Sequence, residues 1–165
     1  MRKTLVLLFV LFLSAGAFGS DYFPVVNSQL AIDGVISSNI VTICAGGQTG
    51  SLYRSTDYGT TWTSIANATV GNTILTGISI AGGTIFAGGT SGTGKVFKSV
   101  DWGSNWTGTA VLAGVAGVTD LFFQDANAGI ATVIFGGGAT WGVRYTTDGG
   151  ANWNAPNLIT QRFHL

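Results

Sequence analysis

The chain has 165 residues, with seven basic and seven acidic side chains and a formal net charge of zero. This weak charge excludes the basic footprint expected of a protein that binds nucleic acid or an anionic membrane surface. Hydrophobic residues make up 46% of the chain and charged residues only 8%, which excludes a disordered chain and favours short packed strands joined by tight turns.

The N-terminus has the pattern of a secretory signal peptide. Arg2 and Lys3 precede the apolar run Leu5–Leu13, and small residues follow as far as Gly19. A bilayer span needs about 20 apolar residues, so this run is too short to cross one. We therefore predict a signal peptide at 1–19 and an exported domain at 20–165, which is secreted, periplasmic or held at the cell surface. No membrane span is expected after cleavage.

The chain has a single cysteine, Cys44, and a single histidine, His164. One cysteine cannot form an intrachain disulfide, and Cys44 lies in an apolar segment where it is expected to be a small core residue. His164 has no second histidine or nearby cysteine with which to bind zinc. We therefore expect no metal site and no cofactor.

A short polar motif occurs three times, starting at Ser55, Ser99 and Thr146. It reads Ser/Thr-x-Asp-x-Gly-x-Thr/Asn-Trp, and its starts lie 44 and 47 residues apart. A period of that length indicates a repeat architecture. The hydroxyl and carboxylate can hold turn N–H groups, Gly tolerates positive φ, and Trp places a large apolar ring in the core. The motif positions are Ser55, Asp57, Gly59, Trp62; Ser99, Asp101, Gly103, Trp106; and Thr146, Asp148, Gly150, Trp153.

Four short strands are expected around each motif, and no helix is expected in the exported domain. Inner strands are predicted near 30–36, 74–81 and 118–124, and second strands, each ending in a Gly pair, at 41–47, 84–89 and 132–138. Third strands at 52–54, 96–98 and 143–145 lead into the motif, and edge strands follow it near 62–66, 106–112 and 153–159. Four antiparallel strands make one propeller blade, so we predict an all-β fold with blades at roughly 28–68, 70–113 and 117–160.

The motif resembles the Asp-box, or bacterial neuraminidase repeat, of β-propeller proteins such as sialidases, sortilin-type receptors and photosystem II assembly factors. The segment Asp120–Gly129 is similar to the inner-strand region of the assembly-factor repeats. The resemblance to the assembly factors implies a scaffold that binds a protein or carbohydrate partner, and the predicted signal peptide implies that it is exported. Two alternatives stay open, namely a fragment of a sialidase-like or other exo-acting glycosidase, and a segment of a sortilin-like receptor.

The sialidase alternative implies an arginine triad that grips a carboxylate, a Tyr nucleophile polarised by Glu, and an Asp that serves as acid/base catalyst. The chain contains no Glu, and Arg54 and Arg144 fall beside the motifs, where they are expected at the blade periphery. A glycosidase needs a pair of carboxylates, and outside the motifs the chain offers Asp21, Asp33, Asp120 and Asp125. We therefore predict no catalytic residues in this chain, with the three motif aspartates acting as turn caps.

Three aromatic residues are candidates for ligand contact. Tyr58 and Trp102 occupy the variable position of the first two motifs, where exposed turns are expected, and Trp141 precedes a predicted strand. Exposed aromatics can stack on sugars or bind a protein, although isolated surface aromatics are also common. The Gly-rich segment 89–95 resembles a phosphate loop superficially, but it runs into a strand and is predicted to be a hairpin turn.

Three blades fall short of the four to eight that usually close a propeller. An open set of blades would expose two apolar faces and unpaired strand edges, which favour aggregation. The sequence therefore predicts either a fragment of a longer chain or a homo-oligomer that closes the ring.

Overall fold

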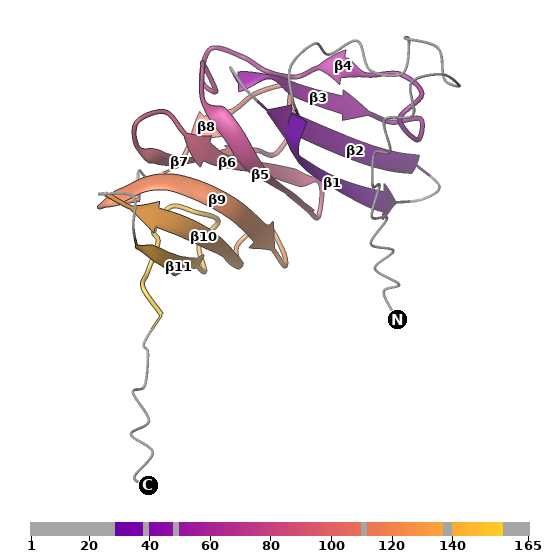
Figure 1. The fold of residues 1–165 in the computed structure, drawn as a ribbon. Coiled ribbons are helices and arrows are strands. Elements are labelled where there is room, and N and C mark those ends of the chain that lie inside the picture. The colour runs from indigo at the N-terminus through magenta and orange to yellow at the C-terminus, as the bar shows by residue number, and fades with distance from the viewer. Residues whose placement is uncertain (1–28, 38–39, 48–49, 110–111, 137–139, 157–165) are drawn as a thin grey trace, which may run out of the picture.

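The computed structural model describes residues 29–37, 40–47, 50–109, 112–136 and 140–156, which form eleven strands (Figure 1). The predicted signal peptide at 1–19, Asp21 and His164 lie outside the described residues. Within the described part of the chain, no helix is long and apolar enough to cross a membrane.

The strands form three antiparallel sheets in chain order. The first sheet contains β1 (Gln29–Ser37), β2 (Ile40–Gly47), β3 (Leu52–Ser55) and β4 (Thr63–Ser64). The second contains β5 (Ile74–Ala81), β6 (Thr84–Thr90), β7 (Gly94–Ser99) and β8 (Thr107–Gly108). The third contains β9 (Val115–Phe123), β10 (Gly129–Phe135) and β11 (Trp141–Thr146). Each sheet pairs its strands with their sequence neighbours, as a propeller blade does.

The three sheets follow one another face to face, with β5 contacting both β1 and β9 (Figure 1). Alternation along β6 supplies both sides of the middle sheet, because successive strand residues point to opposite faces. Ile85 and Ala87 join the apolar cluster shared with the first sheet, and Phe86 joins the cluster shared with the third. The middle sheet is therefore covered on both faces, as an internal blade must be.

The sheets also differ from the predicted pattern at the edge strands. These are much shorter than expected, with two residues each in β4 and β8. In the third sheet the edge position is taken by a single bridge between Tyr145 and Asn154, with backbone N···O distances of 3.0 and 2.8 Å. The motif tryptophans Trp62, Trp106 and Trp153 precede these edge segments, as predicted.

The Gly pairs were expected to end strands at turns, and for β6 this interpretation is wrong. Gly88 and Gly89 lie inside the strand and Thr90 ends it. A Cβ added at Gly88 would lie 2.4 Å from Cδ2 of Leu121 in the third sheet. At Gly89 it would lie 2.0 Å from the carbonyl oxygen of Ile74. The third sheet at Gly88 and the β5 backbone at Gly89, rather than a turn, therefore exclude a side chain here.

The Gly-rich segment predicted to be a hairpin turn does join β6 to β7. Thr90 pairs with Gly94, and the N–H of Ser91 donates to the carbonyl of Thr93 at 3.2 Å. A phosphate-binding loop would open a helix instead.

Candidate functional site

The three motifs, called here box 1 (residues 55–62), box 2 (99–106) and box 3 (146–153), form the same hydrogen-bonded turn. In each, the opening hydroxyl donates to the aspartate and accepts the Gly N–H, while the aspartate accepts from the backbone and side chain of the Thr or Asn. In box 2 these distances are 2.8 Å from Ser99 Oγ to Asp101 Oδ1, 2.7 Å from Gly103 N to Ser99 Oγ, and 2.8 and 2.7 Å from Asn105 to Asp101. Boxes 1 and 3 repeat this set at 2.6 to 2.9 Å.

Each box also bends its backbone through two consecutive residues with positive φ. The first is Tyr58, Trp102 or Gly149, at 60, 60 and 70°, and the second is the box Gly, at 85 to 91°. The variable position between Asp and Gly is therefore constrained in conformation, which the sequence pattern did not reveal. Box 3 meets the constraint with a second glycine, which is free of the Cβ penalty.

The box tryptophans anchor the turns to different extents. The indole N–H of Trp62 donates to the Gly59 carbonyl at 3.0 Å. That of Trp106 donates to Gly103 at 3.1 Å and also to Ile65 of the first sheet at 2.8 Å. The Nε1 of Trp153 is buried without a partner among the described residues. Trp106 is buried in the core shared by the first two sheets, whereas the other two are half-buried.

Hydrogen bonding lowers the pKa of each box aspartate. Donation from Thr61 lowers the pKa of Asp57 to about 2, and donation from Asn152 lowers that of Asp148 to about 2. Donation from Asn105 likewise lowers the pKa of Asp101. A carboxylate held ionised by turn donors is a poor general acid at neutral pH. The geometry of the boxes thus fits the predicted turn-capping role.

The three candidate aromatics do not share one site. Tyr58 is 71% exposed and Trp141, at the start of β11, is 66% exposed. Trp102 lies on a turn as expected, but it is half-buried because its ring packs against the core shared by the first two sheets. A Cβ added at Gly83 would lie 3.4 Å from the Trp102 ring. No common binding surface for the three follows from this placement.

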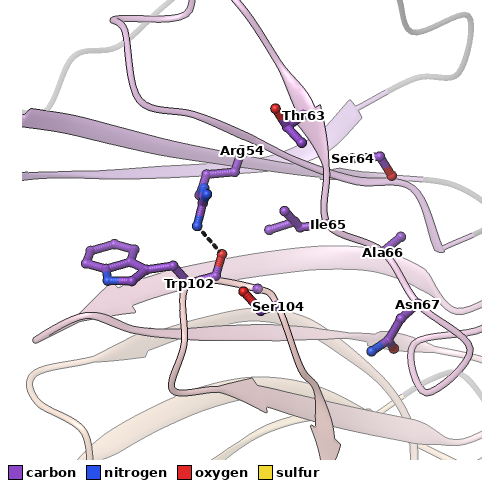
Figure 2. Close-up of a pocket in the computed structure, with 9 residues that line it drawn as sticks. Arg54, Thr63, Ser64, Ile65, Ala66, Asn67, Trp102 and Ser104 are labelled. Atoms are coloured by element: carbon purple, nitrogen blue, oxygen red, sulfur yellow. Dashed lines mark hydrogen bonds between the residues drawn. The ribbon is translucent and has the colours of Figure 1, made fainter.

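A groove of about 300 Å³ lies between the edge of the first sheet and box 2 (Figure 2). At one end the Arg54 guanidinium donates to the backbone carbonyl of Trp102, and at the other end lies Asn67. Between them β4 exposes Thr63 and Ser64. The lining residues are Arg54, Thr63, Ser64, Ile65, Ala66, Asn67, Trp102, Gly103 and Ser104.

The groove offers hydroxyl, amide and guanidinium groups but no carboxylate or imidazole. It can hydrogen-bond a polar or extended ligand, and it lacks the pair of acids that glycoside hydrolysis needs. Of the aspartates outside the boxes, Asp33 accepts from Ile80 N at 2.7 Å and Asp125 accepts from Asn127 N and Ala128 N at 2.7 and 2.8 Å. Among the described residues no cluster of three His, Cys, Asp or Glu could hold a metal ion.

Sequence reasoning assigned Arg54 to the periphery and missed the groove. Arg54 and Lys98 occupy the same position in successive blades, since each lies one residue before a box. Both reach the following blade, because Lys98 Nζ donates to the Ala126 carbonyl at 3.3 Å. The recurrence of a long basic side chain directly before boxes 1 and 2 could have revealed this contact with the following blade.

No protein-family model and no curated protein sequence matches the chain. Solved structures do match it. A structure of YCF48 bound to D1 peptide superposes with a TM-score of 0.64 at 16% identity, over 81% of this chain and 40% of that one. YCF48 from Cyanidioschyzon merolae gives 0.61 at 21% identity, over 81% and 41%. The GH74 enzyme of Niastella koreensis gives 0.54 at 20% identity, over 75% of this chain and 22% of that one.

At these identities the likeness concerns the fold, and the chain spans about 40% of the length of the YCF48 structures. The predicted β-propeller architecture and the predicted likeness to photosystem II assembly-factor repeats are confirmed at that level. The described sheets do not close into a ring. The chain thus has an all-β fold built of propeller-type blades, similar to those of the YCF48 structures.

Proposed function

We propose that the protein is an exported, non-catalytic scaffold that binds an extended segment of another protein. The proposal rests on the hydrogen bonds of the three box aspartates, all of which hold turns. It rests equally on the groove beside box 2, whose lining residues supply hydrogen-bond donors and hydroxyls but no carboxylic acid. Such a surface recognises a ligand by hydrogen bonding and provides no general acid or base.

The groove suits an extended peptide because an edge strand forms one of its walls. β4 pairs with β3 on one side and is the last strand of its sheet. An extended segment laid along such an edge gains main-chain hydrogen bonds, and neighbouring side chains supply specificity. The YCF48 structure that holds a D1 peptide supports a protein partner for a fold of this kind. No partner of this chain is identified by that likeness.

Export follows from the predicted signal peptide, and it is tested separately. Mass spectrometry of protein recovered from the producing cells should find an N-terminus near Ser20, the residue after the predicted cut. Intact Met1 on soluble protein inside the cell would contradict export.

A glycosidase fragment is the second candidate, because GH74 enzymes are among the matching structures. The GH74 xyloglucanase of Xanthomonas campestris superposes with a TM-score of 0.53 at 16% identity, over 70% of this chain and 18% of that one. In that case the catalytic acids would belong to sequence beyond these blades.

The groove is tested with a displayed library of random decapeptides, followed by fluorescence anisotropy on the enriched peptides. Thr63→Trp should fill the groove and weaken peptide binding at least tenfold. Thr107→Trp is the matched control, since Thr107 opens β8 as Thr63 opens β4 and lies in the next blade. Equal loss in both variants, or no enriched peptide, would contradict the proposal. Hydrolysis of xyloglucan oligosaccharides by the wild-type chain would favour the glycosidase alternative instead.

A further inference from the structure

The outer face of the third sheet exposes a set of large apolar side chains. They are drawn from all three strands, β9, β10 and β11, and no described element covers them. This terminal face consists of Phe122 (61% exposed), Ile130 (51%), Trp141 (66%), Val143 (40%) and Tyr145 (38%). Exposed Asp120 and Thr132 lie on the same face, in the row between Ile130 and Trp141. A set of large apolar side chains exposed on one sheet face marks an interaction site.

Strand register shows what occupies the same positions in the preceding blade. Ile130 pairs with Phe122 and Tyr145, just as Phe86 pairs with Ser79 and Lys98. Phe86 is fully buried, and its ring stacks on that of Phe123 in the third sheet with centroids 3.4 Å apart. The terminal face is therefore the face that each earlier blade buries against the next one.

The residue that meets this face in each interface also has a fixed position. Phe123 meets the second sheet, where its N–H donates to Ser79 Oγ at 2.9 Å. Ile80 has the same role toward the first sheet, where it donates to Asp33. The corresponding position of the first sheet is Gly34. Gly34 pairs with Ile43, which in turn pairs with Ser55 of box 1. Ile80 likewise pairs with Ile85, which pairs with Ser99 of box 2. Gly34 is exposed.

We propose that the terminal face binds the first sheet of a second copy of this chain. The second interface places Ser79 and Phe86 against Phe123. The proposed contact places its bulk on one side, with Phe122 and Ile130 against Gly34. Phe122 cannot accept the hydrogen bond that Asp33 and Ser79 accept, so this contact is apolar. The inference stands independently of the proposed peptide groove.

A second recurring contact supports the same partner. Arg54 and Lys98 each reach the backbone at or beside the next box, at Trp102 and at Ala126. Tyr145 holds their position in the third sheet. In the proposed contact it therefore lies against box 1 of the second copy. There Tyr58 is 71% exposed, whereas the equivalent Trp102 is half-buried and packs against the core shared by the first two sheets.

The contact is head to tail, so each copy supplies one terminal face and one first sheet. Such a heterologous interface closes when the rotation fits, and two copies then give six blades, within the usual range of four to eight. Closure covers the terminal face of each copy with the first sheet of the other.

Sedimentation velocity on the recovered protein tests the inference. We expect a species of twice the mass of the chain. Ile130→Asp on the terminal face and Gly34→Trp on the first sheet should each give monomers that retain their β circular dichroism. Val100→Asp should stay dimeric, because Val100 is 72% exposed on the box 2 turn, outside both proposed surfaces.

Three results would overturn the inference. The first is a wild-type protein that is monodisperse and monomeric. The second is a dimer that survives both Ile130→Asp and Gly34→Trp, since another surface would then hold it. The third is a series of trimers and longer species, which would show that the head-to-tail contact does not close.

Discussion

Asp33 of the first sheet accepts a hydrogen bond of 2.7 Å from the backbone N–H of Ile80 in the second. Burial raises the pKa of this carboxyl, against the lowering effect of the bonds from Ile80 and Gly34. Ser79 repeats the contact one blade later, with Phe123 as the donor. The blades are thus joined by a polar contact at a fixed position as well as by their apolar cores.

Removing the Asp33 acceptor should destabilise the first interface. Asp33→Ala leaves the Ile80 N–H without this partner, and we expect a loss of about 1–3 kcal/mol in the free energy of unfolding. Asp33→Asn is the control, since the amide oxygen can still accept and the loss should be smaller. Urea unfolding at neutral pH measures both. Equal stability of Asp33→Ala and wild type would show that the contact contributes nothing.

Acid should weaken the fold through the box aspartates. The folded pKa of about 2 for Asp57 and Asp148 lies below the value near 3.9 of an unfolded chain. The unfolded state therefore binds protons first, and the stability contributed by these groups is lost as the pH falls from about 4 to 2. Urea midpoints across this range should fall more gently in Asp148→Asn.

The raised pKa of Asp33 changes stability with pH in the opposite direction. The part of its contribution that depends on protonation is present below the unfolded pKa and lost as the pH rises through the folded value, whereas the hydrogen bond from Ile80 remains at neutral pH. Asp33→Asn should therefore make the acid loss steeper than in wild type. A gentler loss in this variant would contradict the assigned direction.

The shared positive φ of Tyr58 and Trp102 predicts opposite results for the same substitution. Tyr58→Gly relieves left-handed strain at an exposed position and should raise stability by up to about 1 kcal/mol. Trp102→Gly relieves the same strain but removes a ring packed on the core, so it should destabilise the protein. Urea unfolding of the pair decides this, and destabilisation by Tyr58→Gly would contradict it.

The tryptophans of boxes 2 and 3 offer a further matched pair. Trp106→Phe removes an indole N–H that donates to both Gly103 and Ile65. Trp153→Phe removes a buried indole N–H that has no partner among the described residues. The first change should therefore destabilise more than the second. A larger loss for Trp153→Phe, measured by urea unfolding, would show that its indole N–H is satisfied.

The strands and boxes could be predicted because their signals are local. Alternation and turn residues placed β5 at its observed bounds, and the motif fixed which hydroxyl and carboxylate meet. The contacts between blades could not be predicted, because they join residues far apart in the sequence, 28 positions for Lys98 with Ala126 and 47 for Asp33 with Ile80. For the same reason the partial burial of Trp102 was missed. Trp102 has the same motif position as exposed Tyr58, and only packing against the neighbouring sheet distinguishes the two.

The central claim is that the box aspartates hold turns and do not act on a ligand, and a double-mutant cycle on box 2 tests it most directly. Ser99 is fully buried, and Ser99→Ala should cost about 1–3 kcal/mol because it removes the acceptor of the Gly103 N–H. Asp101→Ala should also lower the thermal midpoint. The double variant should lose less than the sum, because both changes break the 2.8 Å bond from Ser99 to Asp101. Unchanged thermal midpoints in both single variants, together with loss of ligand binding or activity, would contradict the structural role.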